Sequence, residues 1–184
     1  PKVGRSMTKL LTVQFLAAGV GAVKTAMDFE TAFTGVRKTV DGTEEQLAAL
    51  KQGILDMSSE VPASAEAIAA VAEAAGQLGI ETDSILGFTR VMIDLGETTN
   101  LSSDEAATAL ARFANITHMS QKGFDKLGSV IVDLGNKMAT TEAEIVAMGQ
   151  RLAGAGAQIG LSEAEIMGFA AALSSVGIEA EAGG

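Results

Sequence analysis

The sequence predicts an all-α protein built from antiparallel helix hairpins. Three observations lead to this prediction. Alanine is abundant and β-branched runs are rare, proline occurs only at Pro1 and Pro62, and apolar residues recur at the three- and four-residue spacing of one helix face. No segment shows the alternation typical of a strand. We therefore expect helices joined by short loops.

The expected helix starts carry hydroxyl residues. Four fit the capping box, a hydroxyl residue followed by Glu or Gln three positions later: Thr43/Gln46, Ser102/Glu105, Thr141/Glu144 and Ser162/Glu165. Three more are expected to be plain N-caps: Ser64, Thr82 and Ser120. Glycines are expected to end helices at Gly79, Gly96, Gly135, Gly160 and Gly177.

Together these signals place eight helices along the chain. They are expected near residues 7–38, 44–59, 65–78, 83–95, 103–117, 121–134, 142–159 and 163–176. The first contains Gly19 and Gly21, which could break it.

The second helix of each of the last three pairs repeats one apolar stripe. The stripe of Ile85, Phe88, Val91, Met92 and Leu95 recurs at an offset of 39 as Phe124, Leu127, Val130, Ile131 and Leu134, and at an offset of 81 as Ile166, Phe169, Ala172, Leu173 and Val176. The caps Ser64, Ser102 and Thr141 follow one another at offsets of 38 and 39. We interpret residues 61–184 as three αα-hairpin repeats of about 40 residues, after a basic and apolar helical segment over 1–40 and a connecting helix over 41–60. The alternative is that capped amphipathic helices of similar length resemble one another by chance.

Composition excludes several classes of protein. The chain has 184 residues, a net charge of -10 and a pI near 4.5, so it would repel phosphate backbones and no sequence-specific nucleic-acid binding is expected. It contains no cysteine and a single histidine, His118, which excludes disulfides, thiolate catalysis and Cys- or His-rich metal sites. Hydrophobic residues make up 47%, enough for a core. Because it starts at Pro1 and stops without an obvious helix end, we expect it to be a segment of a longer protein.

Charge is unevenly distributed. Residues 1–40 carry six basic and two acidic side chains, and residues 41–184 carry seven basic and 21 acidic side chains. This basic head could contact another molecule or a neighbouring copy, or its lysines could simply be solvated. It contains an uncharged stretch over residues 10–23, which is shorter than the roughly 18–20 residues needed to cross a bilayer. Small residues at Ala17/Gly21 and Ala18/Ala22 would permit close helix contact or mark a kink.

No catalytic, cofactor-binding or metal-binding residue is predicted. The tract from Gly154 to Gly160 resembles a dinucleotide loop, but a helical pattern precedes it, so close helix packing is the better interpretation. The carboxylate pairs Asp104/Glu105, Glu142/Glu144 and Glu163/Glu165 lie in first helical turns, where capping explains them. His118 follows a helix end, where a donor or cation suffices as an explanation. We therefore expect no enzyme and no cofactor.

Several tracts, in this order and spacing, resemble the core region of bacteriophage tail tape-measure proteins, also called minor tail proteins. They are Ala26–Glu30, Val36–Thr39, Ala75–Ile80, Leu110–Thr117, Leu134–Asn136, Thr141–Ile145, Ala153–Ala157 and Leu173–Gly184. Each tract alone is weak, and the ordered set is specific.

The resemblance implies a largely helical structural protein that is present in several copies inside the tail tube of the virion and whose length sets tail length. It also implies assembly in the host cytoplasm and contacts with the tail tube protein, tail assembly chaperones and tail-tip or baseplate hub proteins. Family members leave the tail ahead of the DNA at genome ejection. A homo-oligomer and a transient membrane contact through the N-terminal segment are therefore expected.

The repeated caps and glycine stops predict a chain that folds back on itself. A folded segment would add little to tail length, so we expect an interaction module rather than the ruler itself. The alternatives are a helical-repeat module that binds a tail chaperone or partner peptide, and a membrane-active segment used in genome delivery.

Overall fold

A computed structural model describes residues 26–180, and within them every regular element is a helix. A helix over residues 26–39 is followed by α2 (Glu44–Met57), α3 (Ala65–Gln77), α4 (Thr82–Thr98) and α5 (Ser103–Thr117). A 3-10 turn, η1 (Gln121–Gly123), leads into α6 (Phe124–Lys137), which is followed by α7 (Glu142–Gln158) and α8 (Glu163–Ser175). The predicted all-α class is confirmed. Of the predicted helix over residues 7–38, residues 7–25 lie outside the described part.

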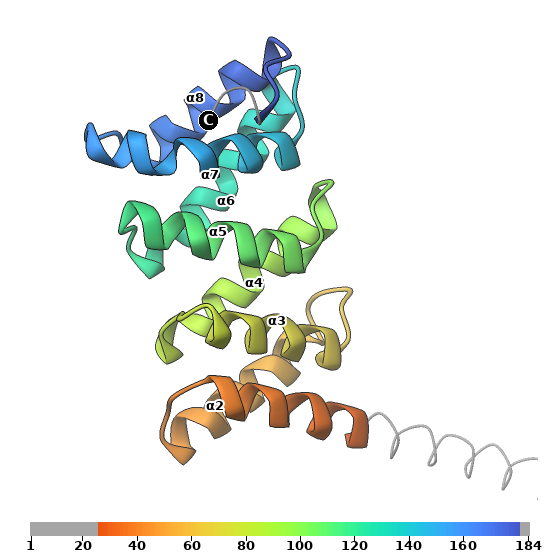
Figure 1. The fold of residues 1–184 in the computed structure, drawn as a ribbon. Coiled ribbons are helices and arrows are strands. Elements are labelled where there is room, and N and C mark those ends of the chain that lie inside the picture. The colour runs from red at the N-terminus through yellow and green to blue at the C-terminus, as the bar shows by residue number, and fades with distance from the viewer. Residues whose placement is uncertain (1–25, 181–184) are drawn as a thin grey trace, which may run out of the picture.

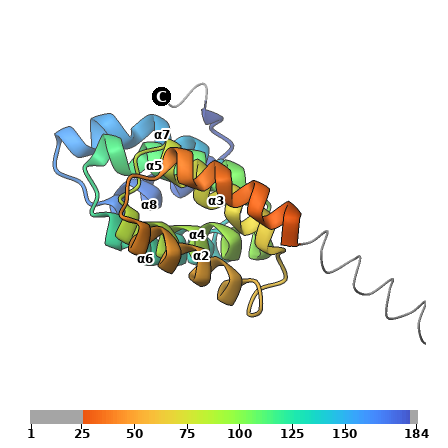
Figure 2. The ribbon, with the colours of Figure 1, turned by 90° about the horizontal axis from the view of Figure 1, so that it is seen from below.

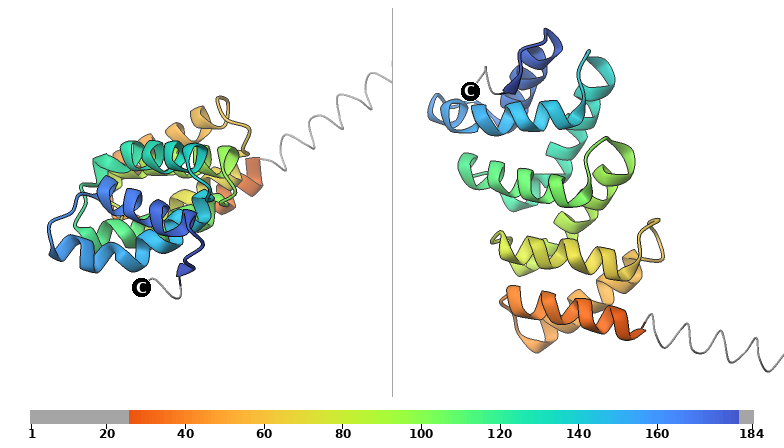
Figure 3. Two further views of the ribbon diagram at one scale, coloured as in Figure 1. Left: turned by 90° about the horizontal axis from the view of Figure 1, so that it is seen from above. Right: turned by 45° about the vertical axis from the view of Figure 1, so that its right-hand side comes forward.

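The helices form stacked layers (Figure 1). Residues 26–39 with α2 make the first layer, and α3 with α4, α5 with α6 and α7 with α8 follow. Each of the two rows is continuous: α3, α5 and α7 pack in succession, and so do α2, α4, α6 and α8. The views along the stack in Figure 2 and in the left panel of Figure 3 show the rows side by side, and the right panel of Figure 3 shows the layers again. Because neighbours in sequence are neighbours in space, the arrangement is that of a helical repeat.

One apolar core runs through the described layers, from Phe29 to Ala171. Phe88 of α4 meets Phe124 of α6 edge to face, with ring centroids 4.7 Å apart. The first two predicted stripes face this core: Ile85, Phe88, Met92 and Leu95 are buried on α4, as are Phe124, Leu127 and Ile131 on α6.

The third predicted stripe is wrong at Phe169, Ala172 and Val176, whereas Ile166 is buried and Leu173 is partly buried against the core. On α8 the buried residues are Ile166, Met167, Ala170 and Ala171, whereas Phe169, Ala172 and Val176 are exposed. The buried face of α8 therefore follows that of α4 at an offset of 78, which is twice the repeat offset of 39, and not at 81. The offset of 81 selected a different face because α8 is apolar on most of its circumference, so its sequence does not mark one stripe.

Two predicted glycine stops are also wrong. α4 continues past Gly96 to Thr98, and α6 continues past Gly135 to Lys137. These glycines instead make room for the next helix: a Cβ on Gly135 would lie 2.6 Å from Cδ of Glu142, and one on Gly96 would lie 3.0 Å from the backbone nitrogen of Ser103. Gly79, Gly160 and Gly177 do follow helix ends with positive φ, as predicted.

The predicted caps differ from the structure at one position. Thr82 is the first residue of α4 rather than its N-cap, and its hydroxyl donates to the backbone oxygen of Asp41 in the layer below. The four capping boxes and the Ser64 cap form as predicted, and Ser120 caps the 3-10 turn.

Candidate interaction surfaces

Three of the first-turn carboxylates act as helix caps. Glu105, Glu144 and Glu165 each accept a hydrogen bond from the backbone N–H of their N-cap residue, with N···O distances of 2.8–3.0 Å. Hydrogen bonds from the Ser102 side chain and backbone hold the pKa of Glu105 below its usual value, and Ser162 does the same for Glu165. For Glu144, the backbone of Thr141 is the main cause of a lowered pKa. These carboxylates are therefore held in the charged form by capping.

The glycine tract lies within a helix. Gly154 and Gly156 are inside α7, and Gly160 follows its end with φ +81°. A Cβ on Gly156 would lie 2.6 Å from Cγ1 of Ile166, and one on Gly149 would lie 2.6 Å from the sulfur of Met167. The small residues let α7 and α8 pack closely, and the strand–loop–helix context of a dinucleotide site is not present at this tract.

His118 is the C-cap of α5 and is exposed. Its backbone adopts φ 56°, ψ 32°, and its N–H bonds to the carbonyl oxygen of Ala114. Among residues 26–180, no group of three or more His, Cys, Asp or Glu side chains is placed to hold a metal ion.

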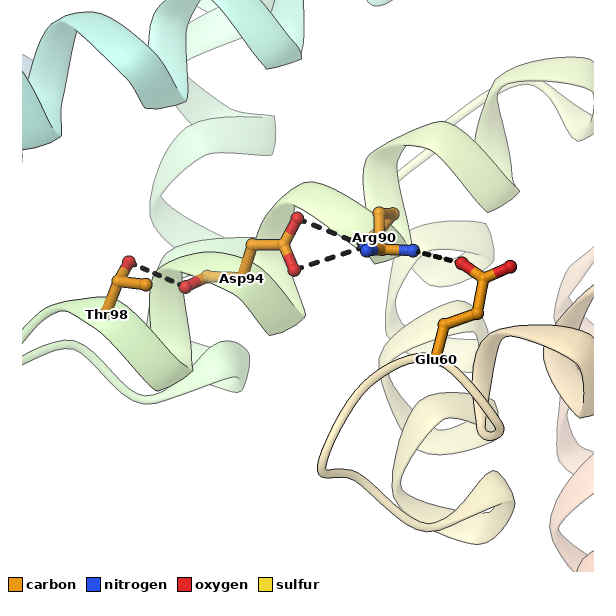
Figure 4. Close-up of polar contacts among 4 residues, drawn as sticks. All are labelled: Glu60, Arg90, Asp94 and Thr98. Carbon is orange, nitrogen blue, oxygen red and sulfur yellow. Dashed lines mark hydrogen bonds and ion pairs between the residues drawn. The ribbon is translucent and has the colours of Figure 1, made fainter.

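An ion-pair network lies on the outer side of α4 (Figure 4). Arg90 Nη1 donates to Oε2 of Glu60 at 2.8 Å, and its Nε donates to both carboxylate oxygens of Asp94 at 3.2 Å. The bond to Glu60 is the main cause of a raised Arg90 pKa. Since these side chains are 40–63% exposed, the network contributes little to stability and mainly joins the α2–α3 loop to α4.

Two shallow grooves follow the rows. The groove between α4 and α6 has a volume of about 520 Å³, and its lining includes the apolar Val91, Leu95 and Val132 and the acidic Asp94, Asp125 and Asp133. The groove between α5 and α7 has a volume of about 510 Å³. In it, Nε2 of Gln150 donates to the carbonyl oxygen of Ala109 at 3.0 Å, which joins the two helices. Both grooves have the shape and mixed polarity of protein-contact surfaces rather than of deep ligand pockets.

The outer side of α8 and the end of α7 expose large apolar side chains. Phe169 is 58% exposed, Val176 73% and Ile159, at the end of α7, 76%. Beside them lies an apolar hollow of about 380 Å³ between the end of α7 and the start of α8, lined by Leu152, Ala155, Gly156, Ile159, Leu161, Ile166 and Phe169. Sequence reasoning missed this surface. The available signal was that no charged residue occurs between Glu165 and Glu179.

Two further predictions concern the N-terminal segment and membrane contact. The small-residue pairs at Ala17/Gly21 and Ala18/Ala22 lie outside the described residues. Within residues 26–180, no helix is long and apolar enough to cross a membrane.

The fold and its surfaces define a helical-repeat protein with shallow grooves along its rows and exposed apolar side chains on α7 and α8. A family model for phage-related minor tail proteins matches residues 51–184. The chain belongs to the phage-related minor tail protein family. Comparison with curated proteins and with solved structures gives no match. Family membership gives the chain a structural role in the phage tail, in contact with other tail components and associated with the virion.

Proposed function

We propose that the chain is part of a tape-measure protein, the tail component that sets tail length, and that this segment is a folded interaction module. The observation that carries the proposal is the return of the chain on itself in stacked layers. A continuous helix over the described residues 26–180 would span about 230 Å at about 1.5 Å per residue. Four layers at a helix spacing of 8–10 Å span only about 40 Å. A fold of this kind adds surface rather than length.

The partners we propose are the tail tube protein, the tail assembly chaperones and the tail-tip or baseplate hub. The grooves along both rows support this proposal, because the lining of each combines apolar with polar and charged side chains. Assembly would take place in the host cytoplasm, and in the finished virion the protein would lie inside the tail tube.

The test is tail length measured by electron microscopy after in-frame deletion of residues 44–175. The proposal predicts lost tails or tails of uncontrolled length, because an organising module is missing. Intact tails shortened by about 1.5 Å per deleted residue would contradict it and make the segment part of the ruler.

A matched variant separates the effect of losing the fold from the effect of shortening the chain. Ile131 is fully buried on α6, so Ile131→Asp disrupts the fold while every residue is retained. The proposal predicts the same assembly defect as in the deletion. Ala70→Asp, at an exposed position of α3, is the control and should leave tails normal. Normal tails with Ile131→Asp would also contradict the proposal.

The second candidate is a module that binds a tail chaperone or partner peptide along one helix row. The groove between α5 and α7 favours it, since its lining includes the small side chains of Thr108, Ala109 and Ala147. Purified chain should then bind a purified tail chaperone, and Ala147→Arg should abolish that binding without loss of helix content. Binding unchanged by Ala147→Arg would exclude this groove.

A further inference from the structure

The groove between α5 and α7 lies on the side of the stack formed by α3, α5 and α7 (Figure 1). Because α5 packs between α3 and α7, this groove is a lateral surface of the stack and not one of its ends. Both helices contribute small side chains to its lining: Thr108 and Ala109 from α5, and Ala143 and Ala147 from α7. Small side chains let the axis of another helix approach to about 8 Å. The groove therefore has room for a helix of another molecule.

Opposite charges stand at the two ends of the α5 side of this groove. Asp104 is in the first turn of α5, and Arg112 lies two turns further on, about 12 Å along the helix axis. Both residues are exposed, and neither side chain has a hydrogen-bond or ion-pair partner among residues 26–180. The groove thus presents two unpaired charges of opposite sign, with Thr108 between them.

Arg112 differs in this respect from the other arginines of the described part. Arg37 and Arg90 form ion pairs with carboxylates, and Arg151 also has an interaction partner. A guanidinium can bind both oxygens of a carboxylate, so an unpaired one in a groove suits a carboxylate from another molecule. An occupant that satisfies both ends of the groove carries a carboxylate and a cation at the spacing of Asp104 and Arg112.

The repeat does not require this arrangement of charges. At the equivalent positions of the neighbouring helices, 39 residues away, the residues are Ala65 and Glu73 on α3 and Ala143 and Arg151 on α7. In this row of the described part, α5 alone carries the acid and the base together. The charge pattern therefore belongs to one place on the surface and not to the fold in general.

α5 itself has the required carboxylate and cation. When two copies of α5 lie antiparallel about a two-fold axis near Thr108, Arg112 of each copy meets Asp104 of the other. One symmetric contact then forms two ion pairs, and the small side chains lie at its centre. We propose that a second copy of the chain occupies this groove, with its α5 seated between α5 and α7 of the first copy.

The contact is isologous, because the same two-fold rotation seats the first α5 in the groove of the second copy. The result is a closed dimer. This inference goes beyond the proposed function, which names no contact between copies. It assigns the groove to a second copy, whereas the second candidate function assigns the same groove to a tail chaperone or partner peptide.

The test exchanges the two charges in the full chain. Sedimentation with interference optics suits a chain without Trp or Tyr. We expect the unchanged chain to be a dimer, and Asp104→Arg or Arg112→Asp alone to lower the association constant at least about tenfold, because each sets like charges against each other. An equimolar mixture of the two variants should form a 1:1 dimer, since both ion pairs are then restored with reversed sign. The double variant should dimerise with itself for the same reason.

Two further variants control the test. Ala147→Arg fills the groove without touching either charge, so it should also give a monomer. Asp125→Arg reverses an exposed first-turn carboxylate on α6, in the other row, and should associate like the unchanged chain. Circular dichroism of each variant checks that helix content is unchanged.

Several results would overturn the proposal. A monomeric unchanged chain would do so, as would unaltered association of Asp104→Arg or Arg112→Asp, or a mixture that stays monomeric. A monomeric chain that binds a purified tail chaperone, and loses that binding with Ala147→Arg, would give the groove to the chaperone instead. None of these results bears on tail assembly after deletion of residues 44–175, so the proposed function can stand if the dimer does not.

Discussion

The side-chain amide of Gln121 is held against the backbone at Glu81, in the preceding layer of the stack. Its Oε1 accepts a hydrogen bond from the Glu81 N–H at 2.7 Å, and its Nε2 donates to the carbonyl oxygen of Gly79 at 3.2 Å. One side chain of the 3-10 turn thus bonds to two backbone groups of the loop between α3 and α4. The sequence separation of Gln121 and Glu81 is close to the repeat length, so the contact joins equivalent corners of successive layers.

Replacing this amide should loosen the junction between layers. Gln121→Leu removes both hydrogen bonds. Because the loop is exposed and water can replace these bonds, we expect a loss of only about 1–2 kcal/mol in the free energy of unfolding. Urea denaturation followed by circular dichroism measures it. Lys122→Ala, at the adjacent exposed position, is the control. Equal stability of the two variants would contradict a role for the amide.

Removing the hydroxyl of Thr89 should make the folded chain more stable. The residue is fully buried in α4, and its Oγ1 has no hydrogen-bond partner. Thr89→Val keeps the shape and the β-branch, so we expect a gain of about 1 kcal/mol in the free energy of unfolding. Thr98→Val is the comparison, because that hydroxyl is exposed and donates to the Asp94 carbonyl oxygen. A destabilised Thr89→Val would show that the hydroxyl has a partner in solution.

The ends of α5 and α7 allow two substitutions with opposite expected effects, one that introduces a glycine and one that removes a glycine. His118 adopts a left-handed backbone that favours glycine, so His118→Gly should stabilise the chain by roughly 0.5–1 kcal/mol. Gly160 has φ +81°, and its Cβ position is open, so Gly160→Ala should cost about 1 kcal/mol through backbone strain alone. Thermal unfolding of both variants checks the signs. The same sign in both would contradict the backbone explanation.

Acid should weaken the capped helices. The pKa values of Glu105, Glu144 and Glu165 are lowered by hydrogen bonds to their N-caps, so the stabilisation they give is present above the unfolded-state pKa of about 4.3. It is lost as the pH falls through the lower folded-state values. Replacing all three by Gln should flatten the stability–pH curve below about pH 4.5, because Gln also completes a capping box, as Gln46 does here.

A matched substitution tests whether the capping bonds cause the loss of stability in acid. Glu97→Gln removes a carboxylate near the end of α4 that makes no cap, so its stability–pH curve should keep the original slope. If the triple variant kept that slope as well, the capping bonds would not be the source of the acid sensitivity.

The sequence predicts local features of the fold well and long-range ones less well. Capping boxes are local, so the starts of α2, α5, α7 and α8 are predicted to the residue. The prediction fails at Gly96 and Gly135 because their role depends on a helix that begins further along the chain, at Ser103 and Glu142. It fails at Phe169 because an apolar residue at helical spacing does not reveal whether another helix covers it.

A folded interaction module must keep its stacked layers inside the tail. The most direct test is a disulfide between positions 140 and 174, whose hydroxyl oxygens lie 2.5 Å apart in the structure although the positions are far apart in the sequence. In one continuous helix the two positions would be about 51 Å apart. Thr140→Cys/Ser174→Cys is introduced into this segment, which has no cysteine of its own, and purified tails are oxidised. The folded module predicts an intramolecular disulfide, which is seen as a reducible shift in electrophoretic mobility. Either single cysteine variant should lack this shift. Tails with no disulfide, or with disulfides only between copies, would contradict the folded module.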